Sequence, residues 1–147
     1  MRWPSALEYQ EAVQGPAVHF LDDRLKTARF DCRPDGRPEF ATGNIAIVFR
    51  AHVRGTPLAV RCFTRGPLNL IDRYRAIADF IDCHQATTPY LSRVELVECG
   101  LRIGGQNLPV LLMPWVMGER LDHAVRAGLG RREMLLTLAG RWRRMLH

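Results

Sequence analysis

The sequence predicts an α+β domain: a five-stranded antiparallel sheet with one packed helix, flanked by an N-terminal helix and two C-terminal helices. Short apolar runs rich in β-branched residues alternate with glycine-containing turns, which is typical of antiparallel strands. Between two groups of such runs, residues 70–84 repeat their apolar side chains at helical spacing. Residues 131–147 show the same spacing, so a further helix is expected there.

A helix is expected near the N-terminus, where Ser5 can act as the N-cap and Glu8 completes a capping box of the S-x-x-E type. Gly15 and Pro16 are expected to end this helix. The residues that follow alternate between short apolar and charged pieces. They are expected to be irregular, apart from one short strand at Val18–Leu21.

The sheet is expected to begin near Glu39, with its second and third strands at Ile45–Val53 and Leu58–Phe63. The turn between these two strands falls at residues 54–56 and contains a glycine. A helix is expected next, at Leu70–His84, because apolar residues recur there at i, i+4, i+7 and i+11.

Two more strand regions are expected after this helix. The first covers Leu91–Cys99 and Leu101–Ile103, and the second covers Leu108–Trp115. Gly104 and Gly105 between them predict a hairpin turn. The strand at Leu108–Trp115 is apolar on both faces, so it is expected at the centre of the sheet.

Two helices are expected after the sheet, at Leu121–Ala127 and from Arg131 onward. Apolar residues line one face of the second helix: Leu135, Leu138, Ala139, Trp142, Met145 and Leu146. An exposed apolar patch of this kind marks an interaction surface. Self-association, a protein partner, or a continuation of the natural protein beyond His147 is therefore expected to cover this helix.

The formal net charge is +6, which favours anionic partners. The arginines are scattered along the chain and form no stripe, so nucleic-acid binding is not expected. No apolar run approaches the roughly 20 residues of a membrane-spanning helix. The N-terminus lacks the apolar segment of a secretory signal, so a cytoplasmic protein is expected. The cysteines and histidines show no metal-ligand spacing, so no metal site is assigned.

Residues 41–48 read A-T-G-N-I-A-I-V, which aligns without a gap to the glycine-rich loop of protein kinases, G-x-G-x-x-G-x-V. Gly43 matches the central glycine, whereas Ala41 and Ala46 replace the outer two. In kinases this loop covers the phosphates of ATP. The resemblance implies nucleotide contacts from Ala41, Thr42, Gly43, Asn44, Ala46 and Val48. An ordinary hairpin turn with one glycine fits the same residues.

Residues 59–62, A-V-R-C, resemble the kinase motif V-A-I-K, whose lysine holds the phosphates and pairs with a glutamate of the next helix. The resemblance places Ala59 and Arg61 beside the nucleotide, with arginine at the lysine position. No glutamate occurs in residues 68–85, and Asp79 is expected on the solvent side of the helix. Arg61 can equally be a strand residue with its charged head at the surface.

Residues 113–121, M-P-W-V-M-G-E-R-L, resemble a kinase hinge. The resemblance implies that Met113 is the gatekeeper, and that the Pro114 carbonyl and the Val116 N–H face the adenine. A core strand that leaves the sheet through a turn fits these residues as well. Trp115 is expected to be a packing residue.

Taken together, the chain resembles the N-terminal lobe of a bacterial serine/threonine protein-kinase-like domain. The pieces W-P-S-x-x-x-Y-x-x-A-V-Q and R-Y-R-A-I add to this resemblance. It implies an N-terminal extension at 1–38, a small lobe at 39–116, and a hinge exit with the first large-lobe helices at 117–147.

The resemblance implies ATP as the ligand of this lobe. The kinase motifs H-R-D and D-F-G, which supply the catalytic and Mg²⁺-binding aspartates, do not occur in the sequence. No catalytic residue is therefore assigned, this chain alone is not expected to hold Mg²⁺, and no phosphoryl transfer is expected. A pseudokinase-type interaction module that binds no nucleotide is the alternative.

Overall fold

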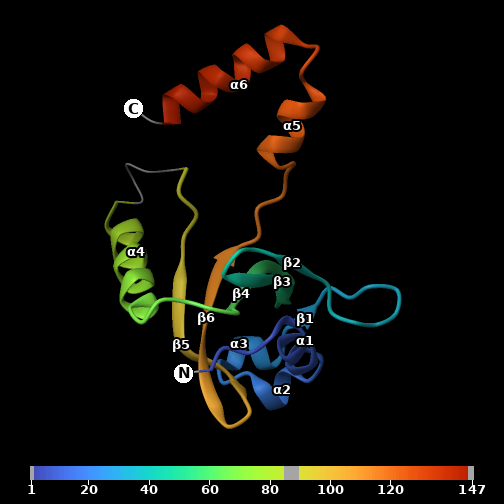
Figure 1. Cartoon of the computed structure of the whole chain (residues 1–147), viewed down its shortest axis with the longest axis vertical. Coiled ribbons are helices and arrows are strands. Elements are labelled where there is room, and N and C mark those ends of the chain that lie inside the picture. Colours follow the sequence, from blue (N-terminus) through green and yellow to red (C-terminus); the bar gives the residue numbers. More distant parts are fainter. Residues whose placement is uncertain (1, 85–89, 146–147) are drawn as a thin grey trace. The chain divides into compact units, whose positions relative to one another are not determined.

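The computed structural model describes residues 2–84 and 90–145. They form two compact units, Met1–Trp115 and Val116–His147 (Figure 1). None of the described helices is both long enough and apolar enough to cross a membrane. The elements of the first unit are α1 (Ala6–Gln14), α2 (Pro16–His19), α3 (Asp23–Lys26), β1 (Arg29–Phe30), β2 (Phe40–Thr42), β3 (Ala46–Val53), β4 (Thr56–Phe63), α4 (Leu70–His84), β5 (Glu95–Ile103) and β6 (Gln106–Pro114).

The second unit contains α5 (Leu121–Ala127) and α6 (Arg132–Met145), close to the two helices that the sequence predicts. Leu146, which the sequence places on the apolar face of α6, lies outside the described residues.

The strands form one antiparallel sheet in the order β1-β3-β4-β6-β5, and β2 also pairs with β3. The central position expected for the last strand is confirmed, because β6 lies between β4 and β5. The predicted strand number of five is wrong, since the sheet has six strands. The additional strand is β1, in which Arg29 pairs with His52 and Phe30 with Ala51. A strand of two residues is too short to show an alternating pattern in the sequence.

The N-terminal capping box is confirmed. The Ser5 hydroxyl accepts the Glu8 N–H at 3.3 Å, and the Glu8 carboxylate accepts the Ser5 N–H at 2.8 Å. However, Gly15-Pro16 does not end the helical region, because Pro16 begins α2. Proline suits the first position of a helix, where its missing N–H would have no partner.

The strand predicted at Val18–Leu21 is wrong, because Val18 and His19 belong to α2. Phe20 alone makes an isolated β-bridge, to Leu101.

Helices α1, α2 and α3 pack together on one face of the sheet, which we call the α1 face (Figure 1). Tyr9 and Gln10 of α1 are both buried and fix the helix in place. The Tyr9 hydroxyl donates to the Phe63 carbonyl at 2.7 Å, and the Gln10 amide donates to the Pro38 carbonyl at 2.8 Å. Burial raises the pKa of Tyr9, so its hydroxyl stays a donor. The core on this face includes Ala12, Val13, Phe20, Leu25, Ile47, Phe49, Val60, Leu108, Val110 and Leu112.

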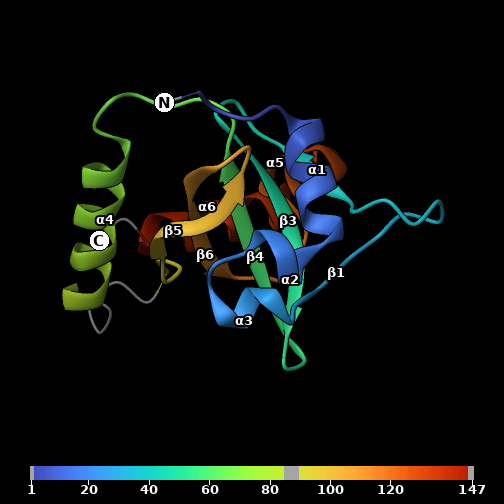
Figure 2. The same cartoon turned by 90° about the horizontal axis from the view of Figure 1, so that it is seen from below.

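Helix α4 covers part of the opposite face, beside β5, and we call this the α4 face (Figure 2). Its bounds agree with the helix predicted at Leu70–His84. The core on this face is smaller and consists of Ala46, Phe63, Leu70 and Leu111. The sheet therefore has one well-filled face and one face with a smaller core.

The two strand segments predicted over 91–103 form one strand, β5, with a bulge between Val97 and Leu101. Gly100 lies in this bulge against Val110 of β6, and a Cβ atom at position 100 would overlap the Val110 Cγ2 atom. The bulge therefore depends on the absence of a side chain at this position.

We predict that Gly100→Ala lowers the free energy of unfolding by about 1–3 kcal/mol, because the added methyl group overpacks a buried contact. Urea unfolding followed by circular dichroism measures this loss. Gly140→Ala is the matched control, since open space surrounds Gly140 and alanine favours the helix. Equal stability of wild type and Gly100→Ala would contradict the prediction.

Candidate functional site

The strand register places three of the predicted site residues in one row on the α4 face. Ala41 of β2 lies opposite Val48 of β3, and Val48 lies opposite Arg61 of β4. The row continues through Leu111 of β6 to Leu96 of β5. Directly opposed residues of neighbouring strands point to the same side of a sheet. Leu111 belongs to the core under α4, so the whole row is on the α4 face.

A second row contains two more predicted residues. Ala59 of β4 lies opposite Met113 of β6, two positions from Arg61 and Leu111, and hence on the same face. Ala59 is buried, and Met113 is half-buried. The structure thus brings Ala41, Val48, Ala59, Arg61 and Met113 to one side of the sheet.

The loop predicted to cover phosphates is a tight turn between β2 and β3. The Gly43 N–H donates to the Ala46 carbonyl at 2.8 Å, so this N–H is used inside the turn. Arg65, just beyond β4, donates from Nε to the Asn44 carbonyl at 2.7 Å and also contacts the Asn44 side chain. Thr42 is one position out of phase with the row and is exposed, whereas Ala46 is buried in the core under α4.

Arg61 is half-buried and reaches toward α4. Its guanidinium carbon lies 5.7 Å from the ring centroid of Phe63 and 5.7 Å from that of Tyr74 on α4. A cation over aromatic faces is stabilised by the ring quadrupoles. On the helix that follows β4, the Arg61 head thus contacts an aromatic side chain. Asp79 is exposed, as its place on the helix predicts.

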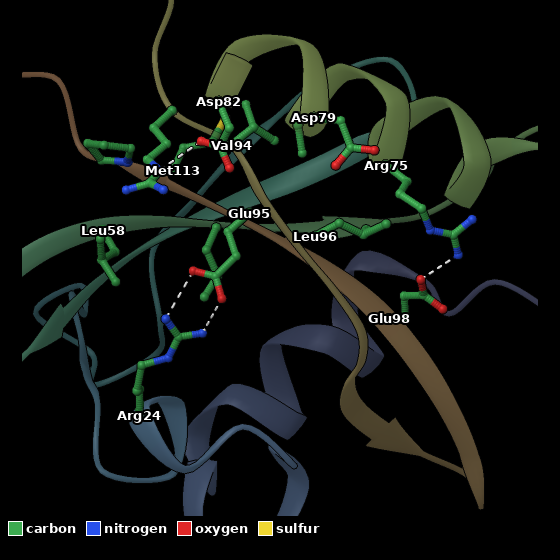
Figure 3. Close-up of a pocket in the computed structure, with 14 residues that line it drawn as sticks. Arg24, Leu58, Arg75, Asp79, Asp82, Val94, Glu95, Leu96, Glu98 and Met113 are labelled. Carbon is green, nitrogen blue, oxygen red and sulfur yellow. Dashed lines mark hydrogen bonds and ion pairs between the residues drawn. The ribbon is translucent and has the colours of Figure 1, made fainter. Parts of the chain in front are cut away.

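The predicted site residues do not share one cavity. Met113 and Pro114 line a cavity of about 510 Å³ beside α4 and β5 (Figure 3). Ala41 and Val48 line a separate hollow of about 240 Å³. Val116 belongs to the second unit and is exposed.

The 240 Å³ hollow is bordered by Trp115, the last residue of the first unit. The Arg50 guanidinium lies over the Trp115 ring, 5.3 Å from its centroid, and Arg50 Nη1 is 3.5 Å from Asp31 Oδ2. Trp115 is therefore a packing residue, as the sequence predicts. The hollow has an apolar wall from Ala41 and Val48 and a charged wall from Arg50 and Asp31.

Half of the residues that line the 510 Å³ cavity are charged, and all of these except Asp79 were missed by sequence reasoning (Figure 3). Six of them form ion pairs: Arg24 with Glu95, Arg75 with Glu98, and Arg93 with Asp82. Arg24 and Glu95 are 71 positions apart in the sequence, and Arg75 and Glu98 are 23 apart. No local pattern in the sequence could have indicated these contacts.

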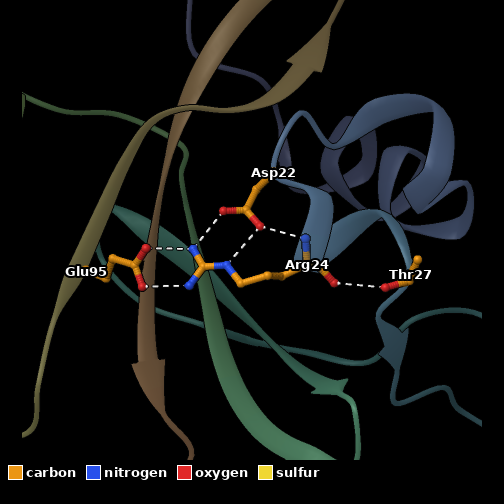
Figure 4. Close-up of polar contacts among 4 residues, drawn as sticks. All are labelled: Asp22, Arg24, Thr27 and Glu95. Carbon is orange, nitrogen blue, oxygen red and sulfur yellow. Dashed lines mark hydrogen bonds and ion pairs between the residues drawn. The ribbon is translucent and has the colours of Figure 1, made fainter.

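Arg24 connects α3 to the edge of the sheet (Figure 4). Its guanidinium contacts Glu95 of β5 at 2.6 Å and Asp22 at 2.7 Å. Asp22 also caps α3, since its carboxylate accepts the Arg24 N–H at 2.9 Å. The side-chain hydrogen bond from Arg24, followed by the backbone hydrogen bond and the positive charge, lowers the pKa of Asp22.

Within residues 2–84 and 90–145, no group of three or more histidine, cysteine, aspartate or glutamate side chains is placed to hold a metal ion. Comparisons with protein-family models, with curated proteins and with solved structures found no match for this chain. The kinase-like resemblance therefore depends on the residues of the chain itself.

We predict that Asp22→Asn lowers the free energy of unfolding by about 1 kcal/mol at pH 7, because asparagine keeps a capping oxygen but loses the charge that pairs with Arg24. The folded-state pKa of Asp22 is lowered, so its contribution is present above about pH 4 and is lost as the pH falls below that value. Thermal unfolding at pH 7, 5 and 3 should show that the difference in melting temperature between the wild type and Asp22→Asn becomes smaller as the pH falls.

Asp23→Asn is the control for this measurement. Its side chain is 91% exposed, so its contact with Lys26 is expected to contribute little. A gap between wild type and Asp22→Asn that stays constant down to pH 3 would refute the assignment of the charge effect.

Proposed function

We propose that the sheet and α4 form a kinase-like nucleotide-binding lobe, with ATP as its ligand. The observation that carries this proposal is the shared face of Ala41, Val48, Ala59, Arg61 and Met113. Ala41 and Val48 line one hollow of this face, and Met113 lines another. Val48 and Met113 supply apolar contacts, and Arg61 supplies a positive charge for phosphate.

The order of elements supports the same proposal. Strands β2, β3 and β4 form a meander, α4 follows, and β5 and β6 complete the sheet before the chain leaves at Trp115. In kinases the phosphate-binding lysine is on the third strand and its partner is on the next helix. Arg61 is on the third strand of this meander, and its head lies over Tyr74 of the next helix.

The proposed activity is binding, and no transfer of a phosphoryl group is assigned. Arginine holds phosphate oxygens through two parallel N–H donors, so Arg61 suits the recognition of a polyphosphate. The rings of Phe63 and Tyr74 restrict where the guanidinium can move. No residue of the chain is assigned to activate an acceptor hydroxyl or to hold Mg²⁺.

A protein-interaction module that binds no nucleotide is the second candidate. Two observations favour it: the Gly43 N–H is already used inside its turn, and α6 exposes large apolar side chains. Leu136 is 60% exposed, Trp142 51% and Met145 36%. Trp142 and Met145, three positions apart, give α6 an apolar surface that a partner or a second copy could bury, whereas Leu136 lies on another side of the helix.

We predict that ATP without Mg²⁺ raises the melting temperature of the wild-type protein in proportion to the logarithm of its concentration. Ligand at about 100 times Kd stabilises the folded state by roughly 2.7 kcal/mol. Arg61→Ala should abolish the shift, and Arg61→Lys should keep it because lysine is the kinase residue. Arg73→Gln, an equal charge loss at an exposed position of α4, should leave the shift unchanged.

No shift with ATP in a folded wild-type protein would reject nucleotide binding and favour the interaction module. An equal shift in the wild type and Arg61→Ala would reject the assigned role of Arg61.

For the interaction module, we predict that the wild type self-associates and that Trp142→Ser reduces the average mass measured by light scattering. The substitution removes the half-exposed indole ring, the largest apolar group that α6 offers to a second copy. Arg141→Gln is a neighbouring control that leaves the apolar face intact. A wild type that stays monomeric at high concentration would contradict this prediction.

A further inference from the structure

An open hollow of about 800 Å³ lies beside the turn between β3 and β4. Its polar lining includes Arg29, Asp31, His52 and Arg54. None of these side chains belongs to the row of residues proposed to bind the nucleotide. The lining combines two strands with a turn, since Arg29 of β1 lies directly opposite His52 of β3.

Arg54 occupies an unusual position for an arginine. It forms a two-residue turn with Gly55 between the paired residues Val53 and Thr56. The φ angles are +50° at Arg54 and +83° at Gly55, which define the left-handed region. Asparagine, aspartate and glycine are the usual residues at the first position of such a turn. The backbone conformation thus does not favour arginine at this position. We therefore look to the arginine side chain for the role of this residue.

The charges around this hollow leave two cations without an acidic partner. Asp31 is the acidic residue of the lining, and its carboxylate accepts a hydrogen bond from His52 Nε2 at 2.8 Å. A carboxylate only accepts, so Nε2 carries the proton. Arg50 Nη1 lies 3.5 Å from the second carboxylate oxygen, Asp31 Oδ2. Arg29 and Arg54 are exposed and have no ion-pair partner among the described residues.

We propose that this hollow binds the phosphate group of a small phosphate monoester, held between the guanidinium groups of Arg29 and Arg54. Guanidinium groups match the oxygen geometry of phosphate and form charge-assisted hydrogen bonds with it. Asp31 is paired with His52 and Arg50, so its charge opposes an anion less than a free carboxylate would. The volume exceeds that of a phosphate ion, which leaves space for the rest of a small molecule.

The test is a titration of ¹⁵N-labelled protein with O-phosphoserine, inorganic phosphate and serine, at ionic strength held constant with sodium chloride. Amide shifts are expected at Arg29, His52, Arg54 and Gly55 with the two phosphates and not with serine. Tighter binding of O-phosphoserine identifies the monoester as the ligand. Equal binding of both phosphates would overturn the monoester assignment and leave inorganic phosphate as the better fit.

Two variants test the arginines. Arg54→Asn and Arg29→Gln are each expected to weaken binding at least about fivefold, the loss typical of a charge-assisted contact. Arg73→Gln on α4 removes the same charge elsewhere and should stay within about twofold of the wild type, as screened distant charges do. Arg61→Ala should also leave this binding unchanged, which separates the phosphate hollow from the nucleotide proposal.

Arg54→Asn also separates binding from folding, because asparagine suits the left-handed turn and should keep or raise the melting temperature. Equal affinity in wild type and Arg54→Asn would overturn the proposal. Shifts that serine or sodium chloride reproduces would overturn it as well.

Discussion

The pairing of β3 with β4 is the constraint on which the rest of the structure depends. Their register runs without interruption from the pair Ala46 and Phe63 to the pair Val53 and Thr56. Side chains alternate between the two faces of a strand, so a slip of one residue would move every side chain to the wrong face. The two-residue turn that closes this hairpin fixes the loop length and so prevents such a slip. The register therefore decides both which residues form the core and which residues share a candidate site.

The two faces that this register creates differ in how completely they are filled. On the α1 face, large side chains such as Phe49 and Val60 are fully buried, and each contributes roughly 1.5–3 kcal/mol by leaving water. Buried hydrogen bonds from Tyr9 and Gln10 add direction to this packing. The α4 face has a smaller core and holds the half-buried Arg61 over aromatic rings. A face of this kind retains the polar and accessible groups that ligand recognition requires.

Much of the fold could be predicted because its signals are local. The capping box of Ser5 and Glu8, the apolar spacing of α4 and the doubly apolar β6 each occupy one continuous stretch. The errors arose where local signals are ambiguous or absent. Gly15-Pro16 can end one helix or begin the next, and β1 is too short to show alternation. For the candidate site, alternation along β3 and β4 predicts a shared face. The contact of Arg61 with Tyr74 and the separation of Met113 from Ala41 depend on packing between distant segments.

The bulge of β5 also affects how the sheet ends in space. β5 is an outer strand, and outer strands present unpaired backbone groups that can pair with other chains. At the bulge, the Gly100 carbonyl accepts the Leu21 N–H at 2.9 Å. Just beyond the bulge, the Arg102 carbonyl lies 3.1 Å from His19 Nδ1. The N-terminal segment thus occupies part of this edge. The backbone groups that it covers are not available for pairing with the edge strand of another chain. The segment thus limits edge-to-edge association, in addition to its contribution to the core.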